Sequence, residues 1–158
     1  DTGENTQTGG RLARVKDYIK GDFCMTYGDG LSNINIRNLV SFHHEHKKLA
    51  TVSVVKPPGR FGALNIDNNN FVKKFNEKPS GDGGYINGGF FVLNKKVIDF
   101  ISGDSVSWES TPMQKLTKDN QLMAFTHDDF WSPMDTLRDK HYLEDLWSKK
   151  EAPWRVWG

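Results

Sequence analysis

Residues 23–30 read FCMTYGDG, an apolar run that ends on one carboxylate between two glycines. The run from Phe23 to Tyr27 is typical of a buried strand, and Asp29 follows where that strand would end. Glycines allow a phosphate or a metal to approach the backbone, and an aspartate at a strand end is a usual Mg²⁺ ligand. A simple turn is the alternative, because GDG is common in loops.

Helical and strand-like patterns alternate on both sides of this stretch. The spacing of Leu12, Val15 and Ile19 predicts a helix that Gly21 ends, and residues 36–43 predict a second one. Further helices are predicted at 95–102, 108–118 and 136–149, strands at 50–55, 85–94 and 121–127, and a hairpin around the NNN at 68–70. The alternation predicts a single α/β domain over residues 1–158, with a mostly parallel layered sheet and an inserted hairpin.

The composition argues against a nucleic-acid-binding protein and against a membrane-spanning one. The 158 residues carry 21 Lys and Arg against 20 Asp and Glu, and no basic block of the kind that a nucleic acid requires. No stretch approaches the run of about 20 apolar residues that spans a bilayer, and the polar start is not typical of a signal peptide. We therefore expect a soluble cytoplasmic protein with neither a nucleic-acid nor a membrane partner.

Three features of the sequence favour structural roles over chemical ones. Cys24 lies in the apolar run, where a small buried side chain is the ordinary interpretation. The histidines of SFHHEHKK, 41–48, have no second cluster of ligands for zinc, so we expect a solvated helix face. The three tryptophans of DLWSKKEAPWRVWG, 145–158, are expected to cover a core or a subunit contact.

A second carboxylate, Asp135, lies in FWSPMDTLRD, 130–139, just before a predicted helix. It could cap that helix, as could Thr136. It could also share one divalent ion with Asp29, provided that the fold brings the ends of two strands together.

The segment FNEKPSGDGGYINGGF, 75–90, offers groups that suit a sugar phosphate. Glu77 and Lys78 supply an acceptor and a cation, while Asn87 and Gly88 supply an amide and accessible backbone. The alternative is a charged surface loop followed by a strand bulge. No serine has the setting of a nucleophile elbow, so a covalent hydrolytic mechanism has no support.

Taken together, these phrases resemble one family over essentially the whole chain. In this order they are TGGRL (8–12), YGDG (27–30), PPGRFGAL (57–64), EKP (77–79), INGGFFVLN (86–94), QLMAF (121–125), FWSPMDTLRDKHYLEDLW (130–147) and APW (152–154). They resemble the glucose-1-phosphate cytidylyltransferases, a branch of the sugar nucleotidyltransferases. The resemblance implies a Rossmann-like nucleotidyltransferase fold and transfer of a cytidylyl group from CTP to glucose 1-phosphate, which gives CDP-glucose for polysaccharide biosynthesis and releases pyrophosphate.

The resemblance also assigns residues. It implies that Asp29 and Asp135 bind Mg²⁺ and that Lys78 pairs with the sugar phosphate. The other implied contacts are to glucose hydroxyls, from Glu77, Asn87 and Gly88, and to the nucleotide, from Thr6, Arg11 and Gly28.

One part of the family pattern does not occur in residues 1–158. Relatives begin with a strand and a glycine-rich GGxGTR loop followed by a lysine, so we expect this chain to correspond to the carboxy-terminal part of the fold and to be weak or inactive alone. A bare edge on the strand Phe23 to Tyr27 would then favour a homo-oligomer or pairing with another polypeptide. The alternatives are a non-catalytic module that binds a sugar phosphate or sugar nucleotide, and a self-associating structural protein.

Overall fold

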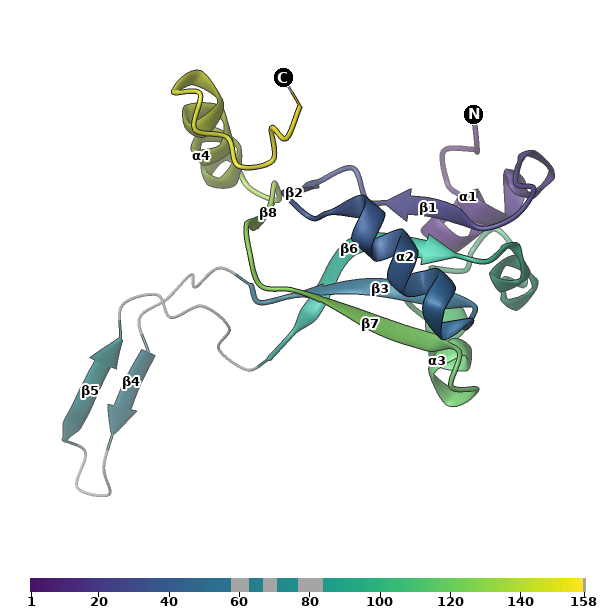
Figure 1. The fold of residues 1–158 in the computed structure, drawn as a ribbon, viewed down its shortest axis with the longest axis horizontal. Helices are drawn as coiled ribbons and strands as arrows, with labels where there is room; N and C mark the ends of the chain where they lie inside the picture. Colours follow the sequence, from purple (N-terminus) through teal and green to yellow (C-terminus); the bar gives the residue numbers. More distant parts are fainter. Residues whose placement is uncertain (58–62, 67–70, 77–83, 158) are drawn as a thin grey trace. The chain divides into compact units, whose positions relative to one another are not determined.

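The computed structural model describes residues 1–57, 63–66, 71–76 and 84–157 (Figure 1). Contacts group the chain into two units. The first comprises Asp1–Tyr27, Asn35–Ser53 and Gly89–Phe125, and the second comprises Gly28–Ile34, Val54–Gly88 and Thr126–Gly158.

The principal sheet has four strands in the order β1-β6-β3-β7 (Figure 1). Its strands are β1 (Phe23–Thr26), β6 (Ile86–Leu93), β3 (Ala50–Val55) and β7 (Leu122–His127). The helices of the first unit are α1 (Thr8–Arg14), α2 (Ile36–His46) and α3 (Thr111–Lys118), with 3₁₀ turns η1 (Lys16–Tyr18) and η2 (Lys95–Phe100). The second unit holds β2 (Gly30–Ser32) paired with β8 (Trp131–Pro133), the hairpin β4 (Ala63–Ile66) with β5 (Val72–Asn76), and α4 (Leu137–Ser148).

The predicted α/β fold is confirmed, with differences in detail. β1 runs antiparallel to β6, with Phe23 opposite Leu93, so the sheet is mixed. The hairpin is present as β4 and β5, although the NNN turn itself lies outside the described residues. α1 ends at Arg14, short of the predicted Ile19, and residues 95–100 form a 3₁₀ turn rather than an α-helix. The three-residue strands β2 and β8 were not predicted.

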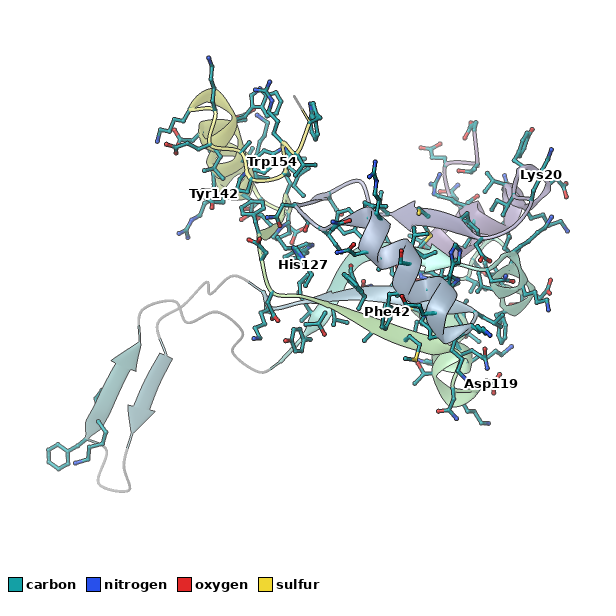
Figure 2. The ribbon with its side chains drawn as sticks, in the orientation of Figure 1. Lys20, Phe42, Asp119, His127, Tyr142 and Trp154 are labelled. Atoms are coloured by element: carbon teal, nitrogen blue, oxygen red, sulfur yellow. The ribbon has the colours of Figure 1, made fainter. Side chains whose placement is uncertain are left out.

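The core of the first unit lies on both faces of β6. Phe91, Val92 and Leu93 are all buried, and consecutive strand residues point to opposite faces, so both faces are covered. Helix α2 packs over β3 and β7, where the Phe42 ring (Figure 2) lies 5.5 Å from that of Phe125. The fully buried Trp108 contacts Phe91 edge to face at 6.1 Å.

Two glycines let α1 pack closely against the segment 104–108. A Cβ atom on Gly10 would lie 2.5 Å from the Asp104 carbonyl oxygen, and one on Gly9 would lie 2.7 Å from that of Val106. The amide of Gln7 donates to the Asp104 carbonyl at 2.9 Å, and the Arg14 guanidinium pairs with the Asp104 carboxylate. The TGG of residues 8–10 is therefore a packing motif.

Cys24 is exposed, so the prediction of a buried thiol was wrong. Along β1, Phe23 and Met25 are half-buried, whereas Cys24 and Thr26, which face the other side of the sheet, are exposed. Within the described ranges β1 is an end strand that pairs with β6 alone.

The predicted solvated face of α2 was also wrong for His43, which is buried at 2% exposure. The Lys48 amide donates to His46 Nδ1 at 2.9 Å, so the neutral His46 ring carries its proton on Nε2 and donates it to Thr51 Oγ1 at 2.7 Å. The Thr51 hydroxyl then donates to His43 Nδ1 at 2.8 Å. This leaves the His43 proton on Nε2, 3.9 Å from the Asp22 carboxylate.

A proton added to His43 would change this chain, because Thr51 would then accept from both rings and its own hydroxyl hydrogen would lose His43 Nδ1 as acceptor. Burial lowers the pKa of His43, opposed by Asp22 and assisted by His46 and His44. Burial also lowers the pKa of His46, with Lys48 contributing.

We therefore expect the free energy of unfolding to decrease as the pH falls below about 6.5, the ordinary histidine pKa, because the unfolded chain then binds protons that the folded chain excludes. Urea unfolding at pH 7.5 and pH 5.5 measures the difference. His43→Gln should reduce it, whereas the matched change His141→Gln, at an exposed position on α4, should retain it. Equal pH dependence in the two variants would contradict the role given to His43.

A small core stabilises the C-terminal part of the second unit. Leu143, Ala152 and Trp154 are buried together, and the Trp154 ring (Figure 2) stacks on that of Phe130 at 5.4 Å. Trp147 and Trp157 are about half exposed. The predicted core role is thus confirmed for Trp154. Among the helices of the described residues, none has the length and apolar character needed to cross a membrane.

Candidate functional site

The ladder between β2 and β8 brings Asp29 and Asp135 to one end of the same strand pair. The two strands are antiparallel, with Gly30 opposite Pro133. The ladder continues one step beyond this pair, because the Met134 amide donates to the Asp29 carbonyl at 2.7 Å. Asp135 is the next residue, so the backbones of these two acids, which are remote in the sequence, reach the same end of this strand pair.

Polar side chains fix the other end of this ladder. The Ser32 hydroxyl donates to the Phe130 carbonyl at 2.9 Å and accepts from the Ile34 amide at 3.1 Å. His127 (Figure 2) reaches both partners, with Nε2 at 3.0 Å from Ser32 Oγ and 3.1 Å from the Phe130 oxygen. These bonds hold two strands that are too short to be stable alone.

Helix α4 begins directly after Asp135, but Asp135 is not its cap. Thr136 Oγ1 accepts from the Asp139 amide at 3.2 Å, and Asp139 Oδ2 accepts from the Thr136 amide at 3.0 Å. This capping box satisfies the start of the helix. Capping is therefore excluded as the explanation of Asp135, and the capping role predicted for Thr136 is confirmed.

The residues present suit Mg²⁺. This ion takes oxygen ligands and is usually held by one or two carboxylates together with water and substrate phosphates. The part of the chain that the structure describes contains no cluster of three or more His, Cys, Asp or Glu that could hold a metal ion. Among the residues that the structure describes, none has an atom within 4 Å of a Cβ placed on Gly28, so these residues leave space beside Asp29.

Asn87 and Gly88, which are predicted to bind the glucose hydroxyls, lie at the start of β6. The Gly88 carbonyl accepts from Trp131 Nε1 at 2.8 Å, which ties β6 to the strand that leads to Asp135. Gly88 is buried, and Asn87 is half-buried. Trp131 was missed at the sequence level, although its place in FWSP beside Asp135 is a signal. Glu77 and Lys78 lie outside the described residues.

A polar cluster lies just before this end of β6 and was also missed. Asp128 Oδ1 accepts from the Tyr85 hydroxyl at 2.9 Å and lies 3.2 Å from Lys56 Nζ. The bond from Tyr85 and then that from Lys56 lower the pKa of Asp128. Asp128 therefore contacts both the residue that follows β3, Lys56, and the residue that precedes β6, Tyr85.

The remaining two predicted contacts lie in the first unit. Thr6 is 7% exposed, which leaves little of it available to a ligand. The Arg11 guanidinium donates to Thr2 Oγ1 at 2.9 Å and to the Glu4 carbonyl at 3.2 Å. Their nucleotide-binding roles stay predictions.

Comparison with known proteins identifies the class to which this fold belongs. Residues 3–144 match the family described as nucleotidyl transferase, and the chain belongs to that family. It is 54% identical over 159 aligned residues to the glucose-1-phosphate cytidylyltransferase of Salmonella typhi, and 40% identical to a probable glucose-1-phosphate cytidylyltransferase of Bacillus subtilis. Each alignment covers 99% of this chain but 62% of the relative, so the chain spans less than two thirds of their length.

Solved structures show the same fold. The crystal structure of HddC from Yersinia pseudotuberculosis matches with a TM-score of 0.68 and 24% identity, covering 91% of this chain and 64% of that one. A putative glucose-1-phosphate thymidylyltransferase from Bacillus anthracis, solved in complex with a sucrose, matches with a TM-score of 0.66 and 20% identity, covering 99% and 64%.

Proposed function

We propose that this chain is part of a glucose-1-phosphate cytidylyltransferase, which makes CDP-glucose and pyrophosphate from CTP and glucose 1-phosphate. The observation that carries the proposal is the 54% identity over 99% of the chain. The more distant mannose-1-phosphate guanylyltransferases, at about 30% identity, support the reaction class but not this substrate pair.

The chemistry requires positioning more than proton transfer. An oxygen of glucose 1-phosphate attacks the α-phosphorus of CTP, and the bond to the β-phosphate oxygen breaks to release pyrophosphate. A phosphate monoester has a second pKa of about 6 and is already a dianion at neutral pH, so no general base is needed. A bound Mg²⁺ would neutralise phosphate charge, and Asp29 and Asp135 would hold it.

The other predicted residues would orient the reactants. Lys78 would pair with the phosphate of glucose 1-phosphate, while Glu77, Asn87 and Gly88 would bind glucose hydroxyls. Gly28 would leave room for the nucleotide, with Thr6 and Arg11 as further contacts. Each of these roles depends on the alignment with the family and on the open space beside Asp29.

Calorimetry with Mg²⁺ present tests the proposal on this chain. We expect binding of glucose 1-phosphate in preference to mannose 1-phosphate, and of CTP in preference to GTP, with slow or absent pyrophosphate release. Absence of binding to all four compounds, or a preference for the mannose and guanosine pair, would contradict the assignment. Binding of the sugar phosphate without turnover when the remainder of a relative is supplied would favour a non-catalytic binding module.

We further propose that β1 pairs with β1 of a second copy of this chain. Among the described strands β1 pairs with β6 alone, so its outer edge is open to further pairing, and Cys24 is exposed on this strand. Light scattering should show an average mass that increases with protein concentration, and mild oxidation should cross-link Cys24 to Cys24. A monomer at all concentrations, with no cross-link, would contradict this.

A further inference from the structure

Tyr27 lies in the chain between β1 and the Gly28–Asp29 turn, and it contacts the strand predicted to read the sugar. Its amide donates to the Gly89 carbonyl at 3.1 Å. Gly89 has a φ of +81°, and a Cβ atom there would lie 2.9 Å from Cδ2 of the Tyr27 ring. The second glycine of INGGF is therefore required so that β6 can pass this ring.

The Tyr27 side chain is held at both its ring and its hydroxyl. The ring packs edge to face on Phe91 at 5.5 Å, and the hydroxyl donates to Glu109 Oε1. Glu109 Oε2 accepts from the hydroxyls of Ser107 and of Thr8, the latter at 2.9 Å. Thus one carboxylate collects three hydroxyl donors from three separate segments.

These bonds also keep Glu109 ionised. Burial would raise the pKa of Glu109, but the hydrogen bonds from Ser107, Tyr27 and Thr8 outweigh it and the pKa lies below its usual value. A hydroxyl bonded to an ionised carboxylate is held more strongly than one bonded to a neutral acceptor.

The neighbouring Gly88 is held separately, because its carbonyl accepts from Trp131 Nε1 at 2.8 Å. The Gly88–Gly89 pair is therefore fixed by two aromatic side chains, Trp131 acting on the first residue and Tyr27 on the second. The predicted sugar contacts, Asn87 and Gly88, precede this point directly in the chain.

We propose that Tyr27, locked by Glu109, is a positioning residue that sets the backbone of Asn87 and Gly88 for glucose 1-phosphate. This inference rests on the proposed function of that strand. Neither Tyr27 nor Glu109 is assigned a ligand contact, so their effect would pass through Gly89 and along β6.

The test compares Tyr27→Phe and Glu109→Gln with the matched control Tyr18→Phe, which removes a hydroxyl from a side chain that is 86% exposed. The first readout is the indole N–H resonance of Trp131, which reports directly on the Gly88 carbonyl and requires no ligand. We expect this resonance to shift and its proton to exchange faster in the two variants, and to be unchanged in the control.

The second readout is the Kd for glucose 1-phosphate with Mg²⁺. We expect it to increase roughly tenfold in both variants, since loss of a residue that orients binding groups commonly costs between one and two orders of magnitude. The double variant should bind no more weakly than either single one, because both changes release the same hydroxyl.

An unchanged Trp131 resonance together with an unchanged Kd would overturn the inference. If the melting temperature of the variants were lower in that case, Tyr27 and Glu109 would serve core packing alone. If the unmodified chain does not bind glucose 1-phosphate, the proposed function fails. The Trp131 resonance would then still decide whether Tyr27 and Glu109 position Gly88.

Discussion

Replacing Asp29 or Asp135 by asparagine is expected to weaken Mg²⁺-dependent binding of CTP by about 100-fold or more, the range seen when a group that organises bound charge is lost. Asparagine keeps the size of the side chain and removes its charge. Each change removes one of two carboxylates at the end of the β2–β8 ladder. Titration calorimetry with and without Mg²⁺ measures the effect.

The matched control is Asp145→Asn on α4. Asp145 is an exposed acid of the same unit that pairs with Lys149 at 2.7 Å, and exposed pairs of this kind contribute little to stability. This variant should bind CTP as the unmodified chain does. The double variant of Asp29 and Asp135 should be little weaker than either single one, because one ion needs both ligands. Full Mg²⁺-dependent binding in either single variant would show that the site lies elsewhere.

Gly10→Ala is expected to destabilise the chain by roughly 2 kcal/mol or more, a value typical of an overpacked site. The added Cβ would lie 2.5 Å from the Asp104 carbonyl oxygen and 2.6 Å from its Cα, and backbone atoms cannot move aside cheaply. Alanine has the higher helix propensity, so the steric cost must exceed a gain of about 1 kcal/mol.

Urea unfolding measures the loss, with Gly21→Ala as the control. A Cβ on Gly21 would meet no atom of the described residues within 4 Å, so the control should stay within about 0.5 kcal/mol of the unmodified chain. Equal stability of the two variants would mean that α1 does not pack as closely on Asp104 as the structure has it.

The sequence was most informative where one local pattern was strong. The apolar run that stops at Asp29 predicted β1, and the apolar spacing after Thr136 predicted α4 with its cap. The alternation of such patterns was sufficient for the α/β fold. The family resemblance predicted Asp29 and Asp135 as metal ligands. The sequence alone could not show that the two residues reach the same end of one strand pair.

The features that sequence reasoning missed depend on pairing at long range. Strands β2 and β8 have three residues each, too few to show a period, and they are held by each other and by Ser32 and His127. His43 looks polar in sequence but is buried because Thr51, on the neighbouring strand, satisfies it. Cys24 looks buried but is exposed because alternate residues of β1 face opposite sides of the sheet, and it lies on the less covered face together with Thr26.

Crystals of the chain grown with Mn²⁺ in place of Mg²⁺ would locate the ion directly by its anomalous scattering. We expect one peak at roughly 2.1 Å from a carboxylate oxygen of Asp29 and from one of Asp135, the distance at which a small divalent cation binds oxygen. A peak at other residues, or carboxylates of Asp29 and Asp135 that face away from each other in the occupied crystal, would contradict the shared metal site.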